Sequence, residues 1–490
     1  MLLSIFAVAT PPLADTRPNI ILIYSDDHAR AAISAYGSPY IKTPNIDRLA
    51  KEGTLYTRHY STNPLCAPSR AAILTGKYSH INGHKDNTTT FDQSQPTISK
   101  MLQSAGYETA VLGKWHLVSN PVGFDEWEVL RGQGLYYEPL FINSEGEHKE
   151  QGYTTELITQ KSLAYLKKQR NKPFFLMIGH KAPHRNWIPN TRNLQMFEGT
   201  TFPEPPTLRS NYSGLSTAAR NAQMRIDTLR PALDLMLDYV PKGMNEQQED
   251  SWKTAFAKQD ADYNAALQRS GDLMGVNFQR YMKNYLRCVA DVDRGVGDVL
   301  DYLDESGLAK NTIVIYSSDQ GFFLGENGWY DKRFFYEPSA GTPLLVKVPG
   351  QRARKDTRLT ADVDLAPTIM SWAGIKPNAM QGTPISSQAK RDRVYGHFYE
   401  SDDPDHKVAK FVALTTQRHK VICYYELAEW ELFDLATDPW ETQSVWNAPA
   451  KSEVRTEMAR KLIQEMRTLK EDPSLIEKVR SLARFGAESE

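Results

Sequence analysis

The residue best suited to covalent chemistry in this 490-residue chain is a cysteine that opens a short ordered string. Cys66 is followed by Ala-Pro-Ser-Arg, ending at Arg70, and then by Leu-Thr-Gly at 74–76. A cysteine thiolate is a nucleophile when its surroundings lower its pKa. Most lone cysteines ahead of a helix are buried structural residues, so the function of Cys66 depends on the partners that the rest of the chain supplies.

Two pairs of oxygen-bearing side chains each follow an apolar run that predicts a buried strand. Asp26 and Asp27 form one pair, and Asp319 and Gln320 form the other. Three carboxylates and an amide oxygen are hard ligands that suit Ca²⁺ better than Zn²⁺. Either pair alone is more typical of polar turn residues, but both pairs brought together would need a cation to offset their repulsion.

Basic and imidazole side chains follow the remaining predicted strands. Lys114 and His116 lie two residues apart, His180 and His184 flank a proline-containing turn, and Lys332 follows a Gly-rich segment. The ordinary interpretation of each residue alone is a solvated lysine or a hydrogen-bonded histidine. Because the net charge of the chain is only −1, any anion that it binds must be held by a local cluster of this kind.

The elements that must position these residues alternate between strands and helices. A mostly parallel sheet with helices on both faces is therefore the predicted fold, with ligands bound beyond the carboxyl ends of the strands. The predicted strands are 19–24, 108–114, 173–179 and 312–319, and the predicted helices include 43–50 and 282–306.

The domain organisation follows from changes along the chain. We expect a catalytic α/β domain over 18–390, interrupted at 189–275 by a polar insertion that is too long for an ordinary loop and is expected to form one wall of the cleft. Alternating patterns between 410 and 435 predict antiparallel strands, so 391–490 is expected to be a smaller β-rich subdomain with a terminal helix.

Composition excludes several classes of protein. Hydrophobic content of 40% and charged content of 24% are those of a soluble globular chain, with no basic surface for nucleic acid. No stretch is long enough to span a bilayer, and three cysteines form no disulfide framework. Residues 1–9 are apolar and rich in small residues, with Ala-Val-Ala at 7–9. We therefore expect residues 1–17 to be a short or truncated signal peptide, with export to the periplasm or beyond. A disordered N-terminus or a misassigned start is the alternative.

The Cys66 string resembles the signature of the type I, formylglycine-dependent sulfatases of the alkaline phosphatase superfamily. The resemblance implies that a maturation enzyme oxidises Cys66 to Cα-formylglycine, whose hydrated aldehyde attacks sulfur and forms a sulfo-enzyme intermediate. It also implies a large sheet sandwiched by helices, followed by a smaller C-terminal subdomain.

The resemblance assigns roles to the residues already described. Asp26, Asp27, Asp319, Gln320 and the modified Cys66 would hold Ca²⁺, although relatives more often carry Asn or His at the Gln320 position.

The remaining catalytic residues would surround the sulfate. Arg70, Lys114 and Lys332 would bind it, His116 would act on the formylglycine hydroxyl, and His184 would act near the leaving-group oxygen. Asn327 stands where relatives often carry histidine, which puts one substrate contact in doubt.

The substrate implied by the resemblance is a sulfated polysaccharide or oligosaccharide. The start at Asp27 and the Gly-Gln-Gly at 132–134 are similar to bacterial glycan sulfatases, including N-acetylglucosamine-6-sulfatases. The candidate substrate contacts are His180, Arg185, Trp187, Arg333 and His406.

Other functions remain open from the sequence. A formylglycine-dependent phosphonate or phosphodiester hydrolase and an arylsulfatase acting on small molecules would both carry the Cys66 string. An alkaline phosphatase would use Ser or Thr and zinc-binding histidines, which are not evident. A sugar-binding protein on an inactive sulfatase scaffold would have lost a catalytic residue, and no matched position shows such a loss.

Overall fold

A computed structural model describes residues 16–387, 389, 391–401 and 403–483. The predicted signal peptide lies outside the described residues except for its last two positions. None of the described helices is both long enough and apolar enough to cross a membrane.

A ten-stranded sheet forms the centre of the molecule, in the order β12-β2-β11-β8-β1-β7-β3-β4-β5-β6. The central strands β8, β1, β7, β3 and β4 run parallel to one another, whereas β11 and the β5–β6 edge are antiparallel, so the predicted mostly parallel sheet is confirmed. The strands are β1 (Asn19–Ser25), β2 (Thr54–Tyr60), β3 (Glu108–Gly113), β4 (Glu126–Leu130), β5 (Leu140–Asn143), β6 (Gly146–Lys149), β7 (Phe174–Gly179), β8 (Thr312–Ser318), β11 (Gly341–Lys347) and β12 (Arg354–Ala361).

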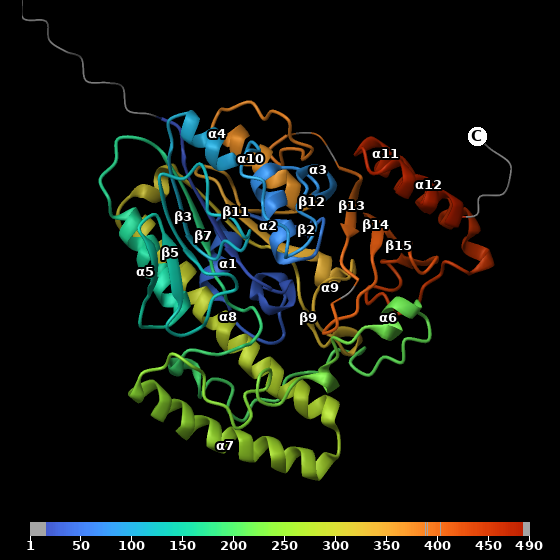
Figure 1. Ribbon diagram of the computed structural model, residues 1–490, viewed down its shortest axis with the longest axis horizontal. Helices are drawn as coiled ribbons and strands as arrows, with labels where there is room; N and C mark the ends of the chain where they lie inside the picture. Colours follow the sequence, from blue (N-terminus) through green and yellow to red (C-terminus); the bar gives the residue numbers. More distant parts are fainter. Residues whose placement is uncertain (1–15, 388, 390, 402, 484–490) are drawn as a thin grey trace, which may run out of the picture.

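Helices cover both faces of this sheet (Figure 1). Ile21 and Ile23 of β1 face one core, and Ile20 and Leu22 face the other, which is why the strand is a continuous apolar run. On the first face lie α1 (Pro44–Glu52), α5 (Thr154–Leu166) and α8 (Leu273–Glu305), and on the second lie α2 (Cys66–Thr75), α4 (Ile98–Ser104) and α10 (Leu365–Trp372).

Helix α8 is longer than the predicted 282–306, because it begins nine residues earlier at Leu273. The Asp272 carboxylate accepts a hydrogen bond from Gly275 N at 3.0 Å and so caps the helix at this earlier position. Along its length α8 packs on α1 and α5. The helix therefore connects the polar insertion to the central sheet.

The insertion at 189–275 divides into two parts. Its long helix α7 (Glu246–Ser270) lies on the far side of α8 from the sheet, so this part does not form a wall of the strand-end region (Figure 1). The preceding segment, 223–238, does approach it. Asp234 pairs with Arg185 at 2.7 Å, and Met224 O accepts a hydrogen bond from Tyr330 N at 3.1 Å.

A four-stranded antiparallel sheet follows the large domain, as the alternating patterns predict. Its strands are β13 (Arg393–Phe398), β14 (Phe411–Thr416), β15 (His419–Tyr424) and β16 (Glu429–Asp434), and the helices α11 (Ser452–Thr468) and α12 (Pro473–Leu482) come after them. The sheet is joined to the large domain by hydrogen bonds such as His397 N to Thr62 O at 2.9 Å and Tyr336 Oη to Glu431 at 2.6 Å.

The end of β3 is fixed by a close backbone approach. Gly113 has φ +98°, and a Cβ at this position would lie 2.1 Å from Gly179 O of β7. The neighbouring Lys114 N donates to the same carbonyl at 2.7 Å. Only glycine permits this backbone, and the approach sets the start of the segment that carries Lys114 and His116.

We expect Gly113→Ala to lower the free energy of unfolding by about 3 kcal/mol or more, because a backbone clash adds to the left-handed strain. Gly37→Ala is the matched control: Gly37 has φ +91° but nothing within 4 Å of a Cβ. Strain alone should cost about 1–2 kcal/mol there. Urea unfolding followed by circular dichroism compares the two, and equal losses would contradict the close approach.

Candidate active site

The loops at the carboxyl ends of the parallel strands converge on one buried site. Asp26 and Asp27 follow β1, and Asp319 and Gln320 follow β8. Neighbouring strands β1 and β8 pair in register up to Ser25 and Ser318, so the two acidic pairs are brought side by side. All four side chains are fully buried.

Three carboxylates meet in this site. Asp26, Asp27 and Asp319 each place an oxygen within 4.8 Å of the others. Burial and the neighbouring acids raise the pKa of Asp27 to about 6, which shows that its negative charge is poorly solvated here. Such a cluster fits a hard divalent cation, whose charge would offset the repulsion.

Gln320 completes a set of four oxygen donors. Its Nε2 contacts Asp27 Oδ1, whereas its Oε1 is buried without a hydrogen-bond partner among the described residues. Amide oxygen and nitrogen are interchangeable by rotation of the amide. The rotated amide would give the site a fourth oxygen and end an unfavourable burial of Oε1, so the donor set fits Ca²⁺.

Each carboxylate also contacts a basic side chain. Arg70 of α2 donates through Nε and Nη2 to Asp319, at 3.0 and 2.8 Å, and Nη2 also reaches Asp26 at 3.2 Å. Lys114 Nζ contacts Asp26, and Lys332 Nζ donates to Asp27 at 2.8 Å. The side chains of Arg70, Lys114 and Lys332 are thus held in place by ion pairs with the buried carboxylates.

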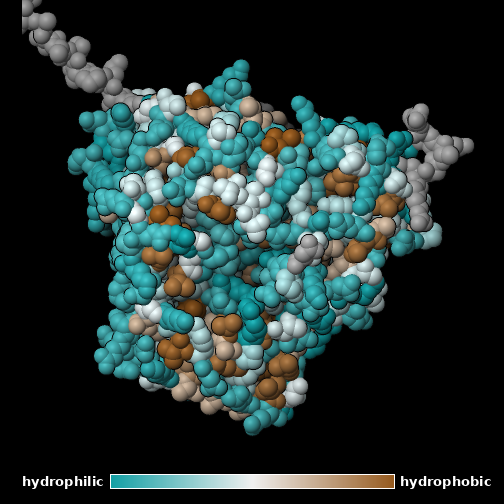
Figure 2. All heavy atoms as spheres, viewed as in Figure 1, coloured by the Kyte–Doolittle hydropathy of each residue, from teal (hydrophilic) through white to brown (hydrophobic). Residues whose placement is uncertain are grey.

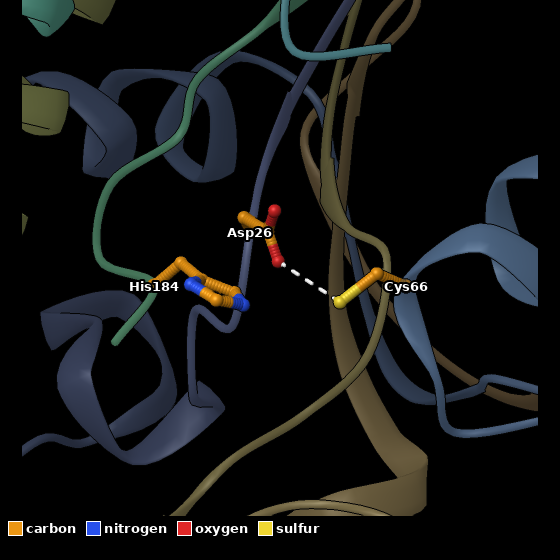
Figure 3. Close-up of side chains that lie close together, drawn as sticks. All are labelled: Asp26, Cys66 and His184. Carbon is orange, nitrogen blue, oxygen red and sulfur yellow. Dashed lines mark hydrogen bonds between the residues drawn. The ribbon is translucent and has the colours of Figure 1, made fainter. Parts of the chain in front are cut away.

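Cys66 is the first residue of α2 and points into this cluster. Its Sγ lies 3.4 Å from Asp26 Oδ1 and 3.7 Å from Gln320 Nε2, and Figure 3 shows Asp26 near both Cys66 and His184. Burial raises the pKa of the Cys66 thiol to about 12. The unmodified thiol is therefore protonated at neutral pH, which disfavours the direct thiolate mechanism.

Two of the predicted histidines lie within the charged cluster. His184 Nε2 is 3.8 Å from Asp27 Oδ2, and its Nδ1 contacts the Arg185 carbonyl. Burial and then the nearby lysines lower the pKa of His184 and of His116, so both rings are neutral in the resting site. His180 is also buried, and burial lowers its pKa to about 4.

Several non-glycine residues of the site have left-handed backbone. The φ angles are +67° at Asp27, +57° at His116, +75° at Asp331 and +88° at Arg333. Each such residue costs about 1–3 kcal/mol and persists only where the surrounding structure fixes it. These four residues lie at the acid cluster, in the segment after β3 and in the loop that carries Lys332.

The side chain of Trp187 is fully buried, which contradicts the predicted sugar contact. The indole packs against Tyr281, with ring centroids 4.6 Å apart, and against Phe322 and Tyr330. No face of the ring is free for a sugar to stack on. Trp187 is therefore part of the aromatic core and does not line the site.

The predicted contact Arg185 already has an acidic partner. Its Nε and Nη2 both donate to Asp234 at 2.7 Å, and its guanidinium lies over the ring of Tyr330. The pair joins the loop after β7 to the insertion. Arg185 therefore has little hydrogen-bonding capacity left for a substrate, apart from Nη1.

Arg333 and His406 lie together beside Lys332. Arg333 contacts Asp331 and donates to Asp403 at 3.1 Å, and His406 contacts the same two acids at 3.3 and 2.6 Å. His406 is only 7% exposed, so it does not lie in a solvated loop. The chain thus forms a polar cluster of alternating charge at the edge of the site.

Lys181 is a site residue that sequence analysis missed. It is 4% exposed, its Nζ lies 4.9 Å above the ring of Tyr136, and it makes no ion pair within the described part of the chain. Burial lowers its pKa to about 8. Its position between His180 and His184, on the same turn, is the feature of the sequence that could have identified it.

Gln133 is a second site residue whose role the sequence did not show. It accepts a hydrogen bond from Lys114, whereas in the sequence it stands out only as part of the Gly-Gln-Gly stretch.

Comparisons with known proteins agree with this geometry. The family model described as sulfatase matches residues 18–375, and the model for the C-terminal part of N-sulphoglucosamine sulphohydrolase matches residues 325–468. An N-acetylglucosamine-6-O-sulfatase from Bacteroides thetaiotaomicron is 40% identical, over 96% of this chain and 90% of its own length.

Two solved structures show how far the likeness extends. One, determined with its substrate D-glucosamine-2-N,6-O-disulfate, is 39% identical, covers 93% of this chain and 98% of its own, and has a TM-score of 0.89. The phosphonate monoester hydrolase of Agrobacterium radiobacter, 19% identical over 92% of this chain and 96% of its own, has a TM-score of 0.71 and shares the fold. From the family match and the 40% identity, the chain belongs to the sulfatase family, the sulfuric ester hydrolases of the alkaline phosphatase superfamily.

Proposed function

We propose that this chain hydrolyses sulfate esters on a sulfated glycan, with a 6-O-sulfated glucosamine unit as its substrate. The observation that carries the proposal is the convergence of Cys66, three carboxylates and three cations in one buried site. The sugar class is supported by the name of the 40% identical relative, an N-acetylglucosamine-6-O-sulfatase, and by the 39% identical structure solved with a 6-O-sulfated glucosamine.

The metal ligands in this proposal are Asp26, Asp27, Asp319 and Gln320. A calcium ion held there would supply positive charge beside the sulfuryl oxygens. Arg70, Lys114 and Lys332 are already fixed by the same acids, so they would bind the sulfate without rearranging. Preorganised charge of this kind is commonly the largest catalytic contribution, and removing one such contact costs about 10²–10³-fold in rate.

The nucleophile is the side chain of residue 66 after conversion of Cys66 to formylglycine. The high pKa of the buried thiol supports the need for conversion, because a hydrated aldehyde does not depend on thiolate formation. His116 is proposed to act on the hydroxyl of the converted residue. Its Nδ1 is buried without a partner among the described residues, and burial and the charge of Lys114 lower its pKa.

His184 is proposed as the general acid for the leaving sugar oxygen. In the resting site burial and the nearby lysines lower the pKa of the ring and keep it neutral. A bound anionic ester would partly neutralise those lysines and raise the pKa of His184, so the ring would gain its proton when substrate is present.

Sugar recognition is assigned to the polar cluster of Asp331, Arg333, Asp403 and His406, with Lys181 as an additional cation for an anionic group. These side chains border Lys332 without belonging to the carboxylate cluster. A small aryl sulfate has no sugar and would not need contacts with these side chains. The phosphonate hydrolase alternative is supported by fold alone, at 19% identity.

Formylglycine should be detectable in protein produced together with a formylglycine-generating enzyme. In the tryptic peptide from His59 to Arg70, the cysteine should lose sulfur and gain an aldehyde oxygen, as measured by mass spectrometry. Cys66→Ala should be inactive on every sulfate ester. A fully active preparation whose peptide carries only the thiol would refute this proposal.

The glycan substrate is tested with two sulfate esters, N-acetylglucosamine 6-O-sulfate and an aryl sulfate whose phenol is acidic. Wild type should turn over the sugar sulfate and leave aryl phosphate diesters nearly untouched. His406→Ala should raise KM for the sugar sulfate about tenfold or more and change aryl sulfate hydrolysis little, because only remote binding is lost.

His184→Ala gives the contrasting result in the same assay. It should lower kcat for the sugar sulfate by about 10²-fold or more and spare the aryl sulfate, whose leaving group needs no proton. Parallel losses on both substrates would assign His184 to binding, and parallel losses for His406→Ala would assign that residue to the fold or the chemistry.

A further inference from the structure

A second cavity lies on the opposite side of α8 from the active site. It has a volume of about 460 Å³ and is enclosed by α7, α8 and residues 198–204. The two sites share the same part of the helix. Tyr285 of α8 donates to the backbone carbonyl of Asp27 at 2.6 Å, while Arg287, two residues further along, lines the cavity.

Arg287 is fully buried but contacts only neutral groups. Its Nε donates to Met196 O at 3.0 Å, and its Nη1 donates to Gln259 at 2.9 Å and Asn284 at 3.4 Å. Its Nη2 has no hydrogen-bond partner among the described residues. A buried charge without an ionic partner is costly, since neutral hydrogen bonds only partly replace its hydration.

The other buried arginines of the described chain do not share this feature. Arg70 contacts Asp319, Arg280 contacts Asp260, and Arg333 contacts Asp331. Arg287 alone lacks a carboxylate, although Arg280 lies two helical turns away on the same helix. Arg287 is therefore a buried cation without a carboxylate partner among the described residues.

A second cation borders the same cavity. Lys283 lies one turn before Arg287 on α8, is partly buried, and has no carboxylate partner within the described residues. The acids that line the cavity are engaged elsewhere: Glu204 and Asp272 contact Arg209, and Asp262 accepts from Lys258 at 2.7 Å. The remaining acid, Glu198, is exposed and makes no ion pair with Arg287.

We propose that this cavity is a second anion site, in which Arg287 and Lys283 bind a tetrahedral oxyanion of the sulfate class. The guanidinium Nη2 and the ammonium supply charge-assisted hydrogen-bond donors, and the surrounding amide and hydroxyl groups, such as those of Gln259 and Tyr263, line the remainder. Free sulfate and a sulfate group carried on a glycan share this chemistry. The site does not depend on the proposed function, because it uses no residue of the active site.

The electrostatics of Arg287 and Lys283 favour binding of an anion. Burial and the charge of Arg280 lower the pKa of Arg287 to about 10, and burial together with Arg287 lowers the pKa of Lys283. One anion bound between Arg287 and Lys283 would stabilise the charged form of both.

Anomalous diffraction locates the anion directly. Crystals of the calcium-loaded wild type soaked in sodium selenate should show a selenium peak within hydrogen-bond distance of Arg287 Nη2, in addition to any peak in the active site. Arg287→Met should lose the cavity peak and keep the active-site peak. A selenium peak confined to the active site of wild type would overturn the proposal.

If Arg287→Met does not fold, sulfate binding measured in solution with a second variant, Lys283→Gln, tests the same site. In a Cys66→Ala background, which prevents turnover, Lys283→Gln should weaken sodium sulfate binding to the second site by about tenfold or more, as measured by calorimetry. Lys253→Gln is the matched control, because Lys253 is an exposed lysine of α7 outside the cavity. Equal affinities for the two variants would contradict the assignment.

A sulfated heparin tetrasaccharide distinguishes the two sources of the anion. If Lys283→Gln weakens binding of the tetrasaccharide and of free sulfate alike, the cavity accepts a sulfate group on a glycan. If it weakens binding of free sulfate only, the site is restricted to the free anion, which is the inorganic product of sulfate ester hydrolysis. If neither affinity falls, the proposed anion site is refuted.

Discussion

The central physical constraint in this structure is the burial of three carboxylates at the tips of two adjacent parallel strands. Register between β1 and β8 forces Asp26, Asp27 and Asp319 together where no water can solvate them. The other features of the site offset this concentration of negative charge. Arg70 contacts Asp26 and Asp319, Lys114 contacts Asp26, and Lys332 contacts Asp27. Four oxygen donors are grouped as a divalent cation requires.

The fold holds these opposing charges in place from several directions. Helix α2 carries Cys66 and Arg70, the close approach of Gly113 to Gly179 places Lys114, and the strained loop around Asp331 places Lys332. The surface facing the viewer in Figure 2 is mixed, with hydrophobic residues scattered among hydrophilic ones, so the distinctive chemistry of the chain lies inside it. Because the cations are fixed before substrate arrives, the site is preorganised for an anionic ester.

Sequence patterns predicted the parallel sheet and the residues at its strand ends because buried strands are continuous apolar runs that end in polar residues. They could not locate contacts made between distant segments. The helix predicted at 43–50 forms as α1, but the local pattern does not show that its Asn45 and Ile46 amides donate to Asp293 of α8, at 3.1 and 2.9 Å. Helix α8 begins at Leu273, where Asp272 caps it, and it packs against α7, a contact that a local pattern does not show.

For the site residues too, position was predictable from the sequence, whereas long-range contacts were not. The acids and Lys114 follow strands and were predictable by position, whereas the environment of each side chain was not. Trp187 was expected to contact sugar but lies within an aromatic cluster, and Lys181 was overlooked although it is the unpaired cation of the same turn. Exposure and pairing depend on neighbours that come from other parts of the chain, such as Asp234, which occupies Arg185.

The most direct test of this account is the response of protein stability to calcium. After exhaustive chelation the protein should melt at a lower temperature, and added Ca²⁺ should restore stability by about 2.7 kcal/mol at a hundredfold excess over Kd, more effectively than Zn²⁺. Asp319→Asn should abolish the response, while Asp301→Asn, at an exposed position on α8, should keep it. An unchanged melting temperature after verified removal of all metal would show that the basic residues alone balance the buried carboxylates, and would contradict the account.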